Sequence, residues 1–124
     1  MTALPDIEVY FQGIADDALS PWLSGALGQA LAPRARASGW VATLDTLTLR
    51  VIPKAQGAWS ALNLSPATAS PWADDEALAK ALAEAFPSAR LRYADAPWRE
   101  GEDVDAERFN DWREGRWHPV LWKG

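Results

Sequence analysis

The sequence predicts an α+β fold of the ferredoxin-like type, in which a four-stranded antiparallel sheet carries two helices on one face. Two observations support this fold class. Predicted strands and helices follow one another in the order βαββαβ, and runs of alternating apolar and polar residues mark the strands. A chain of 124 residues is long enough for one domain. We expect a core over residues 1–96 and an extension of the same domain over residues 97–124.

The strands of the predicted core are recognised by their period of two. In Ile7–Gln12, every second residue is a large apolar one. The stretch Leu47–Leu64 reads as a β-hairpin, because two alternating arms flank a short loop that contains Gly57. A further short strand is expected at Arg90–Ala94. Alternation of this kind is typical of a sheet with one face on the core and the other face exposed.

Both predicted helices begin at the tripeptide Ser-Pro-Trp, which occurs at Ser20 and again at Ser70. Serine is a good N-cap, and proline suits the first helical turn, where its missing N–H costs nothing. The stretches that follow carry apolar residues at helical spacing and end before Pro33 and Pro87. The shared tripeptide makes the two halves of the core look alike.

The C-terminal extension is rich in tryptophan and acidic residues. The sequence Trp-Arg-Glu-Gly occurs twice in it, at Trp98 and at Trp112. Disordered segments are poor in aromatic residues, so we expect the extension to pack back onto the domain. Its last stretch, Arg116–Lys123, alternates like a strand, and Pro119 would restrict that strand to the edge of a sheet.

Composition excludes several kinds of chemistry. With no cysteine, the chain has no disulfide, no thiolate nucleophile and no cysteine-ligated metal. It has one histidine, His118, and neither a Gly-x-Ser-x-Gly motif nor a glycine-rich phosphate loop. We therefore expect no catalytic or cofactor-binding residues and no cofactor. The acidic run 102–107 departs from a calcium loop, since Arg108 stands where glycine is needed, and we expect no metal site.

The predicted location and the net charge of the chain argue against membrane and nucleic-acid partners. The chain has no apolar run long enough to span a membrane and no signal-peptide pattern at residue 1, which predicts a cytoplasmic protein without a membrane partner. Its net charge of −5 makes binding to nucleic acid unfavourable.

A candidate binding site lies on the sheet face away from the predicted helices. Alternation places Tyr10, Arg50, Trp59 and Arg92 there. Aromatic and arginine side chains on an open sheet are the layout by which RNA recognition motifs stack bases, and Val9–Ile14 resembles their first-strand motif. The third strand lacks the paired aromatic residues of that motif. The competing interpretation is that the acidic extension covers this face and pairs its carboxylates with the arginines.

One group of proteins resembles this chain at the level of short motifs. The segment Lys54–Ser60, the pair Pro71-Trp72 before an acidic helix start, and the tryptophan-bearing acidic extension resemble those of a group of small uncharacterised proteobacterial proteins. This resemblance implies no particular activity, and no functional residue can be carried over from it.

Three functions remain open. The sequence favours a small, non-catalytic module that binds another protein, because tryptophan and arginine are enriched where binding energy concentrates. The alternatives are a small-ligand-binding protein or enzyme with a pocket between sheet and extension, and an acidic mimic of nucleic acid. A homodimer is compatible with each.

Overall fold

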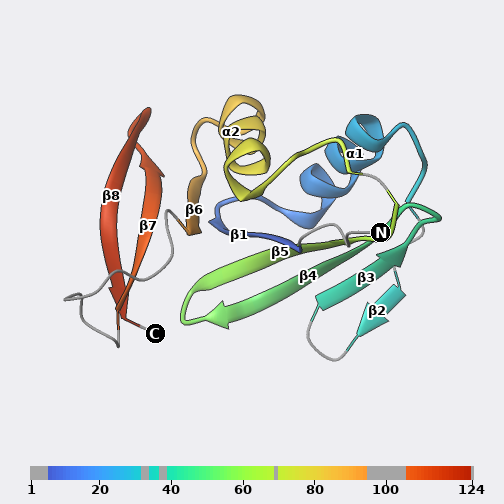
Figure 1. The fold of residues 1–124 in the computed structure, drawn as a ribbon, viewed down its shortest axis with the longest axis horizontal. Helices are drawn as coiled ribbons and strands as arrows, with labels where there is room; N and C mark the ends of the chain where they lie inside the picture. The colour runs from blue at the N-terminus through green and yellow to red at the C-terminus, as the bar shows by residue number, and fades with distance from the viewer. Residues whose placement is uncertain (1–5, 32–33, 37–38, 69, 95–105, 124) are drawn as a thin grey trace.

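The protein is described here by a computed structural model, which covers residues 6–31, 34–36, 39–68, 70–94 and 106–123. These residues form one antiparallel sheet of eight strands in the order β2-β3-β4-β5-β1-β6-β7-β8. Two helices lie on one face of it (Figure 1). Neither helix is long and apolar enough to cross a membrane. The elements are β1 (Ile7–Gln12), α1 (Asp16–Leu27), β2 (Arg34–Arg36), β3 (Gly39–Thr43), β4 (Leu47–Gln56), β5 (Trp59–Pro66), α2 (Asp75–Ala85), β6 (Arg90–Ala94), β7 (Ala106–Arg113) and β8 (Arg116–Lys123).

The prediction of a four-stranded ferredoxin-like sheet is wrong, because the sheet has eight strands. The strands predicted at Ile7–Gln12, Leu47–Leu64 and Arg90–Ala94 are present and form its middle, in the order β4-β5-β1-β6. Three outer strands, β2, β3 and β7, were missed, whereas β8 coincides with the strand predicted at Arg116–Lys123. On one side, β2 and β3 form in a stretch that reads as a connector. On the other side, the C-terminal extension continues the sheet as β7 and β8 instead of lying over it.

The core forms between the helices and the sheet face that they cover. Alternation sets this face: Ile7, Val9 and Phe11 of β1 are buried, as the period-two pattern predicts. The hairpin of β4 and β5 is confirmed, with Leu49 opposite Leu64. Burial of each such aliphatic side chain contributes about 2 kcal/mol relative to leaving it exposed. The same core takes in the following buried leucines of the helices and the hairpin: Leu19, Leu23, Leu47, Leu62, Leu78 and Leu82.

Neither Ser-Pro-Trp tripeptide opens a helix. Helix α1 begins at Asp16, so Pro21 lies inside it, and helix α2 begins at Asp75. In both cases acidic residues occupy the first turn, where the helix dipole favours negative charge. The tryptophans of the two tripeptides meet instead. The rings of Trp22 and Trp72 stack with their centroids 5.6 Å apart and their planes at 20°.

A close approach between backbones sets how β3 meets β4. Gly39 has a φ of 101°, and a Cβ built on it would lie 1.8 Å from the carbonyl oxygen of Val51. The pairing of β4 with β5 shifts register just beyond this point, between Ile52 and Gln56. No residue with a side chain fits at Gly39 without movement of β4.

Substitution of Gly39 should therefore be costly. We expect Gly39→Ala to lower the free energy of unfolding by about 2 kcal/mol or more, because the new methyl group meets backbone and the φ is unfavourable. Gly25→Ala in α1 is the matched control. Nothing lies within 4 Å of its added Cβ, and it should raise stability by about 1 kcal/mol. Urea unfolding measures both; a Gly39→Ala protein as stable as the parent contradicts the close approach.

Candidate binding site

Three of the four predicted binding residues meet, and the fourth does not. The guanidinium carbon of Arg92 lies 4.5 Å from the ring centroid of Trp59. Tyr10 joins them through a shared neighbour, Trp122, whose ring centroid is 4.9 Å from that of Tyr10 and 5.6 Å from that of Trp59. Arg50 is exposed on β4, where it pairs in register with Asn63. The structure therefore separates Arg50 from the other three residues, and its binding role stays a prediction.

Trp122 belongs to β8, which is three strands away from β1 in the sheet. Its ring reaches Tyr10 only because the sheet is strongly twisted: the hairpin of β7 and β8 stands steeply across the direction of β4 and β5 (Figure 1). Phe109 of β7 fills the space between, in edge contact with both rings. We call the group formed in this way the aromatic–arginine cluster; it consists of Tyr10, Trp59, Arg90, Arg92, Phe109, Asp111 and Trp122.

Asp111 of β7 lies at the centre of this cluster with none of its surface exposed. Its carboxylate is 2.9 Å from Nη2 of Arg90, 3.5 Å from Nε of Arg92 and 3.8 Å from Nε of Arg113. A buried charge is tolerated in a protein when it is paired. A carboxylate of the extension thus pairs with arginines of this sheet face. Sequence reasoning did not single out Asp111, since its two nearest partners, Arg90 and Arg92, come from β6 and only the pairing of β6 with β7 identifies them.

Much of the cluster is buried. Trp59 is 7% exposed and the side chain of Arg92 is 15% exposed. The guanidinium of Arg92 lies against both indole rings, at 4.5 Å from Trp59 and 4.9 Å from Trp122. The structure gives these residues a packing role, in a second apolar cluster on the face without helices. A binding role for Tyr10, Trp59 and Arg92 stays a prediction.

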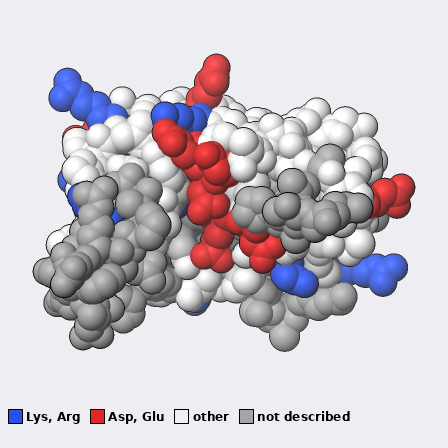
Figure 2. All heavy atoms as spheres, viewed as in Figure 1, with Lys and Arg blue, Asp and Glu red and all other residues white. Residues whose placement is uncertain are grey.

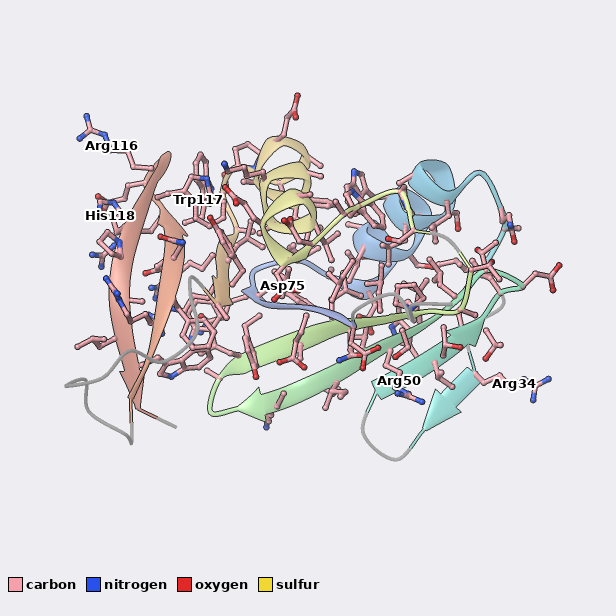
Figure 3. The ribbon with its side chains drawn as sticks, viewed as in Figure 1. Arg34, Arg50, Asp75, Arg116, Trp117 and His118 are labelled. Atoms are coloured by element: carbon pink, nitrogen blue, oxygen red, sulfur yellow. The ribbon has the colours of Figure 1, made fainter. Side chains whose placement is uncertain are left out.

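Arginines surround the cluster on the solvent side. In an antiparallel pair, residues opposite one another share a face. Arg92 pairs with Asp111, Asp111 with His118, and Arg113 with Arg116. Figure 3 shows Arg116 and His118 on the outer side of β8 and Trp117 on the side toward α2. We call the set Arg90, Arg113, Arg116 and His118 the basic patch.

Charge in the basic patch is unbalanced. The side chains of Arg90 and Arg113 are 40% and 51% exposed, and Arg116 is exposed as well. In the part of the chain that the structure describes, Arg90, Arg92 and Arg113 face the carboxylate of Asp111, and Arg116 lies opposite Arg113 across the turn that contains Glu114. Among these described side chains, positive charges outnumber negative ones, on a chain whose net charge is −5.

Acidic side chains gather elsewhere, in a band across the middle of the face shown in Figure 2. Asp75, the first residue of α2, has a structural role. β6 pairs with β1 only from Tyr10 to Gln12, and beyond that point Oδ1 of Asp75 accepts a hydrogen bond of 3.0 Å from the backbone N–H of Glu8. Burial raises the pKa of the Asp75 carboxyl, and the charges of Glu8 and Asp74 raise it further, against the opposing effect of that hydrogen bond.

Both edges of the sheet are poor sites for adding a strand. β2 has three residues. In the turn before β8, Glu114 and Gly115 both have positive φ, of 53° and 77°, which is typical of a two-residue type I′ turn. From that turn, hydrogen-bonded and non-hydrogen-bonded residue pairs alternate along the hairpin. Pro119 and Asn110 form a non-hydrogen-bonded pair, so the nitrogen of Pro119 points away from β7 and the outer edge of β8 lacks a backbone donor at its middle. The prediction that Pro119 restricts its strand to an edge is confirmed. Leu121, 69% exposed, lies on this edge strand.

The structure does not test the acidic run considered as a cation site. Residues 102–105 lie outside the described residues, and the side chains of 106 and 107 are not described. Among the residues that are described, no group of three or more histidine, aspartate or glutamate side chains is placed to hold a metal ion.

The buried carboxylate should be essential for stability. We expect Asp111→Asn to lower the free energy of unfolding by about 3 kcal/mol, because the neutral amide leaves the arginines around it without a counter-charge. Glu84→Gln, an exposed change of the same charge on α2, should stay within about 0.5 kcal/mol of the parent. Urea unfolding compares them, and equal stability of the two variants would rule out a structural role for the Asp111 pairing.

The raised pKa of Asp75 predicts how stability depends on pH. The folded protein holds the proton of this carboxyl more tightly than the unfolded chain, in which the pKa is about 4. The contribution of Asp75 is therefore fully present below pH 4 and is lost as the pH rises through the folded pKa. Asp75→Asn keeps an oxygen for the Glu8 N–H and does not titrate.

Unfolding of the parent and of Asp75→Asn between pH 3 and pH 7 measures this contribution. The difference in stability between the two proteins should shift in favour of Asp75→Asn as the pH rises. A shift in the opposite direction would mean that the hydrogen bond from Glu8 outweighs burial.

Comparison of the chain with protein-family models, curated proteins and solved structures finds no match. The resemblance to small proteobacterial proteins stays a prediction.

Proposed function

We propose that the protein is a non-catalytic binding module, and that it binds an acidic segment of another protein at the basic patch. One observation carries the proposal: exposed arginines gather at one end of the sheet although the chain as a whole is acidic. A cytoplasmic location belongs to the same proposal.

The arginines are suited to carboxylates. A guanidinium offers a planar fork of donors that matches a carboxylate in two-point contact. Arg113 and Arg116 flank the tight turn between β7 and β8, and their pairing across the hairpin holds them side by side. Arg90 joins them from β6, fixed by its 2.9 Å contact with Asp111. Side chains that are held in place before binding lose less entropy when a partner arrives.

The distribution of charge favours a short acidic segment over a nucleic acid. At physiological salt, charges interact over roughly 8 Å, so a partner that covers only the basic patch experiences mainly its arginines. A long polyanion would extend beyond the patch toward the acidic band of Figure 2 and be repelled there. The same argument weighs against an acidic mimic of nucleic acid, which needs its carboxylates, not its arginines, at the binding surface.

The contact should use the sheet face rather than the edges. A segment that adds to β8 would find no donor at Pro119, and β2 is too short to guide a strand. Binding through exposed arginine side chains does not need backbone donors. This places the partner across β6, β7 and the turn at Glu114-Gly115.

The proposal is tested by reversing charge at the patch. Fluorescence anisotropy with a labelled poly-glutamate peptide should show binding that weakens as salt is raised. Arg113→Glu with Arg116→Glu should weaken it by about tenfold or more. Arg34→Glu with Arg50→Glu makes the same change in net charge at the other end of the sheet (Figure 3) and should have less than about a threefold effect.

Arg116→Glu alone guards against a folding defect, because Arg113 also contacts Asp111 at 3.8 Å. Each variant is checked by its melting temperature. An equal loss in both double variants would show that net charge alone drives the interaction. Tighter binding of a single-stranded DNA of equal charge than of the peptide would also contradict the proposal.

A further inference from the structure

A second feature of the face without helices lies at the opposite end of the sheet, over β3 and β4. There the surface is hollowed, with a volume of about 550 Å³. The side chains of Val41, Thr43, Thr48, Arg50 and Ile52 line it from this face. Sites for small molecules commonly have volumes of about 300–1,000 Å³. This hollow is separate from the basic patch and does not depend on it.

The register of the two strands sorts the lining by chemistry. Val41 lies opposite Arg50, and Thr43 lies opposite Thr48. Ile52 follows two residues beyond Arg50, on the same face. The apolar side chains therefore gather at one end, the hydroxyl groups gather at the other, and the guanidinium of Arg50 lies between them. Val41 and Ile52 are partly exposed to solvent in the absence of a ligand.

Arg50 differs from the arginines of the aromatic–arginine cluster. Arg90 and Arg92 lie against Asp111 and the ring of Trp59. Arg50 is exposed, and the described residues give it no salt bridge, hydrogen bond or ring contact. Across the strand it faces Asn63, whose amide nitrogen already donates to Glu8. A cation with no salt-bridge partner among the described residues, beside partly exposed apolar side chains, is complementary to an anion that carries an apolar body.

We propose that this hollow binds a small amphipathic carboxylate, with its carboxylate on Arg50 and its apolar part against Val41 and Ile52. Two parallel N–H···O bonds from a guanidinium match a carboxylate, and the apolar contact supplies the hydrophobic contribution. A fully polar anion such as phosphate would gain only the contact with Arg50. An uncharged apolar molecule would gain only the contacts with Val41 and Ile52.

The test is a titration followed by two-dimensional ¹H–¹⁵N NMR of the whole chain, with three probes. Sodium octanoate, below its micelle concentration, should shift the amide signals of Val41, Arg50 and Ile52 in a saturable way. 1-Octanol and inorganic phosphate should each bind about tenfold more weakly, since each lacks one half of the interaction. The three titrations together separate charge from apolar contact.

Arg50→Met removes the charge and keeps an apolar stem. It should weaken octanoate binding by about tenfold and leave 1-octanol binding unchanged. Arg116→Met, an exposed arginine on β8 at the other end of the sheet, is the matched control and should bind octanoate like the parent. Because Arg50 is exposed, the variant should fold, and its spectrum shows whether it does.

Three results would overturn the proposal. They are equal affinities for octanoate and 1-octanol, an Arg50→Met variant that binds octanoate like the parent, and shifts confined to Arg113 and Arg116. The last result would assign the carboxylate to the basic patch. Failure here leaves the acidic-peptide experiment unaffected, since that experiment depends on Arg113 and Arg116.

Discussion

The buried carboxylate of Asp111 is the constraint on which the C-terminal half of the sheet depends. A charge with no exposed surface needs partners, and Asp111 obtains them from β6 and from its own strand. The pairing fixes β7 beside β6 in a single register, because a shift by one residue would turn the carboxylate to the opposite face. Once β7 is fixed, the tight turn brings β8 back beside it, and Trp122 reaches Tyr10 and Trp59.

The two faces of the sheet are therefore stabilised by different means. The helices cover one face with an uncharged core in which leucine, valine and isoleucine pack with aromatic rings such as those of Phe11, Trp40 and Trp72. On the other face the twist of the sheet itself closes part of the surface, with aromatic rings and guanidinium groups in contact. Guanidinium groups lose less hydration than ammonium groups when they lie against aromatic rings, which suits them to this position. What remains open on this face is the hollow of β3 and β4 and the rim of arginines on β6–β8.

Local pattern predicts the elements whose own residues carry the signal. Period-two alternation located β1, the hairpin of β4 and β5, and β6, since one face of each is buried. It failed for β7, where the charged residues Arg108, Asp111 and Arg113 hide the alternation. The second Trp-Arg-Glu-Gly sequence contains the turn at Glu114-Gly115, but glutamate in a left-handed conformation is rarely a turn signal. The start of α1 was missed because the Ser-Pro pair at Ser20 was taken as the helix start in preference to the acidic pair Asp16-Asp17.

The candidate site shows the same division between local and tertiary information. Alternation correctly placed Tyr10 and Arg92 on one face, because both belong to well-marked strands. It could not separate Arg50 from them, as distance along a sheet depends on strand order. Asp111 and Trp122 owe their importance to partners far away in the sequence, and no periodicity within β7 or β8 reveals those partners.

The missing donor at Pro119 has a consequence for the behaviour of many copies together. An open sheet that exposes a strand at each end resembles a monomer with two reactive ends, which can grow into a fibre by repeated addition. Growth of that kind needs the edge strands of each pair of neighbouring copies to form a hydrogen-bonded ladder. With β8 interrupted at its centre and β2 reduced to three residues, neither end supports a full ladder. The described edge strands therefore disfavour polymerisation, although Leu121 is exposed on one of them.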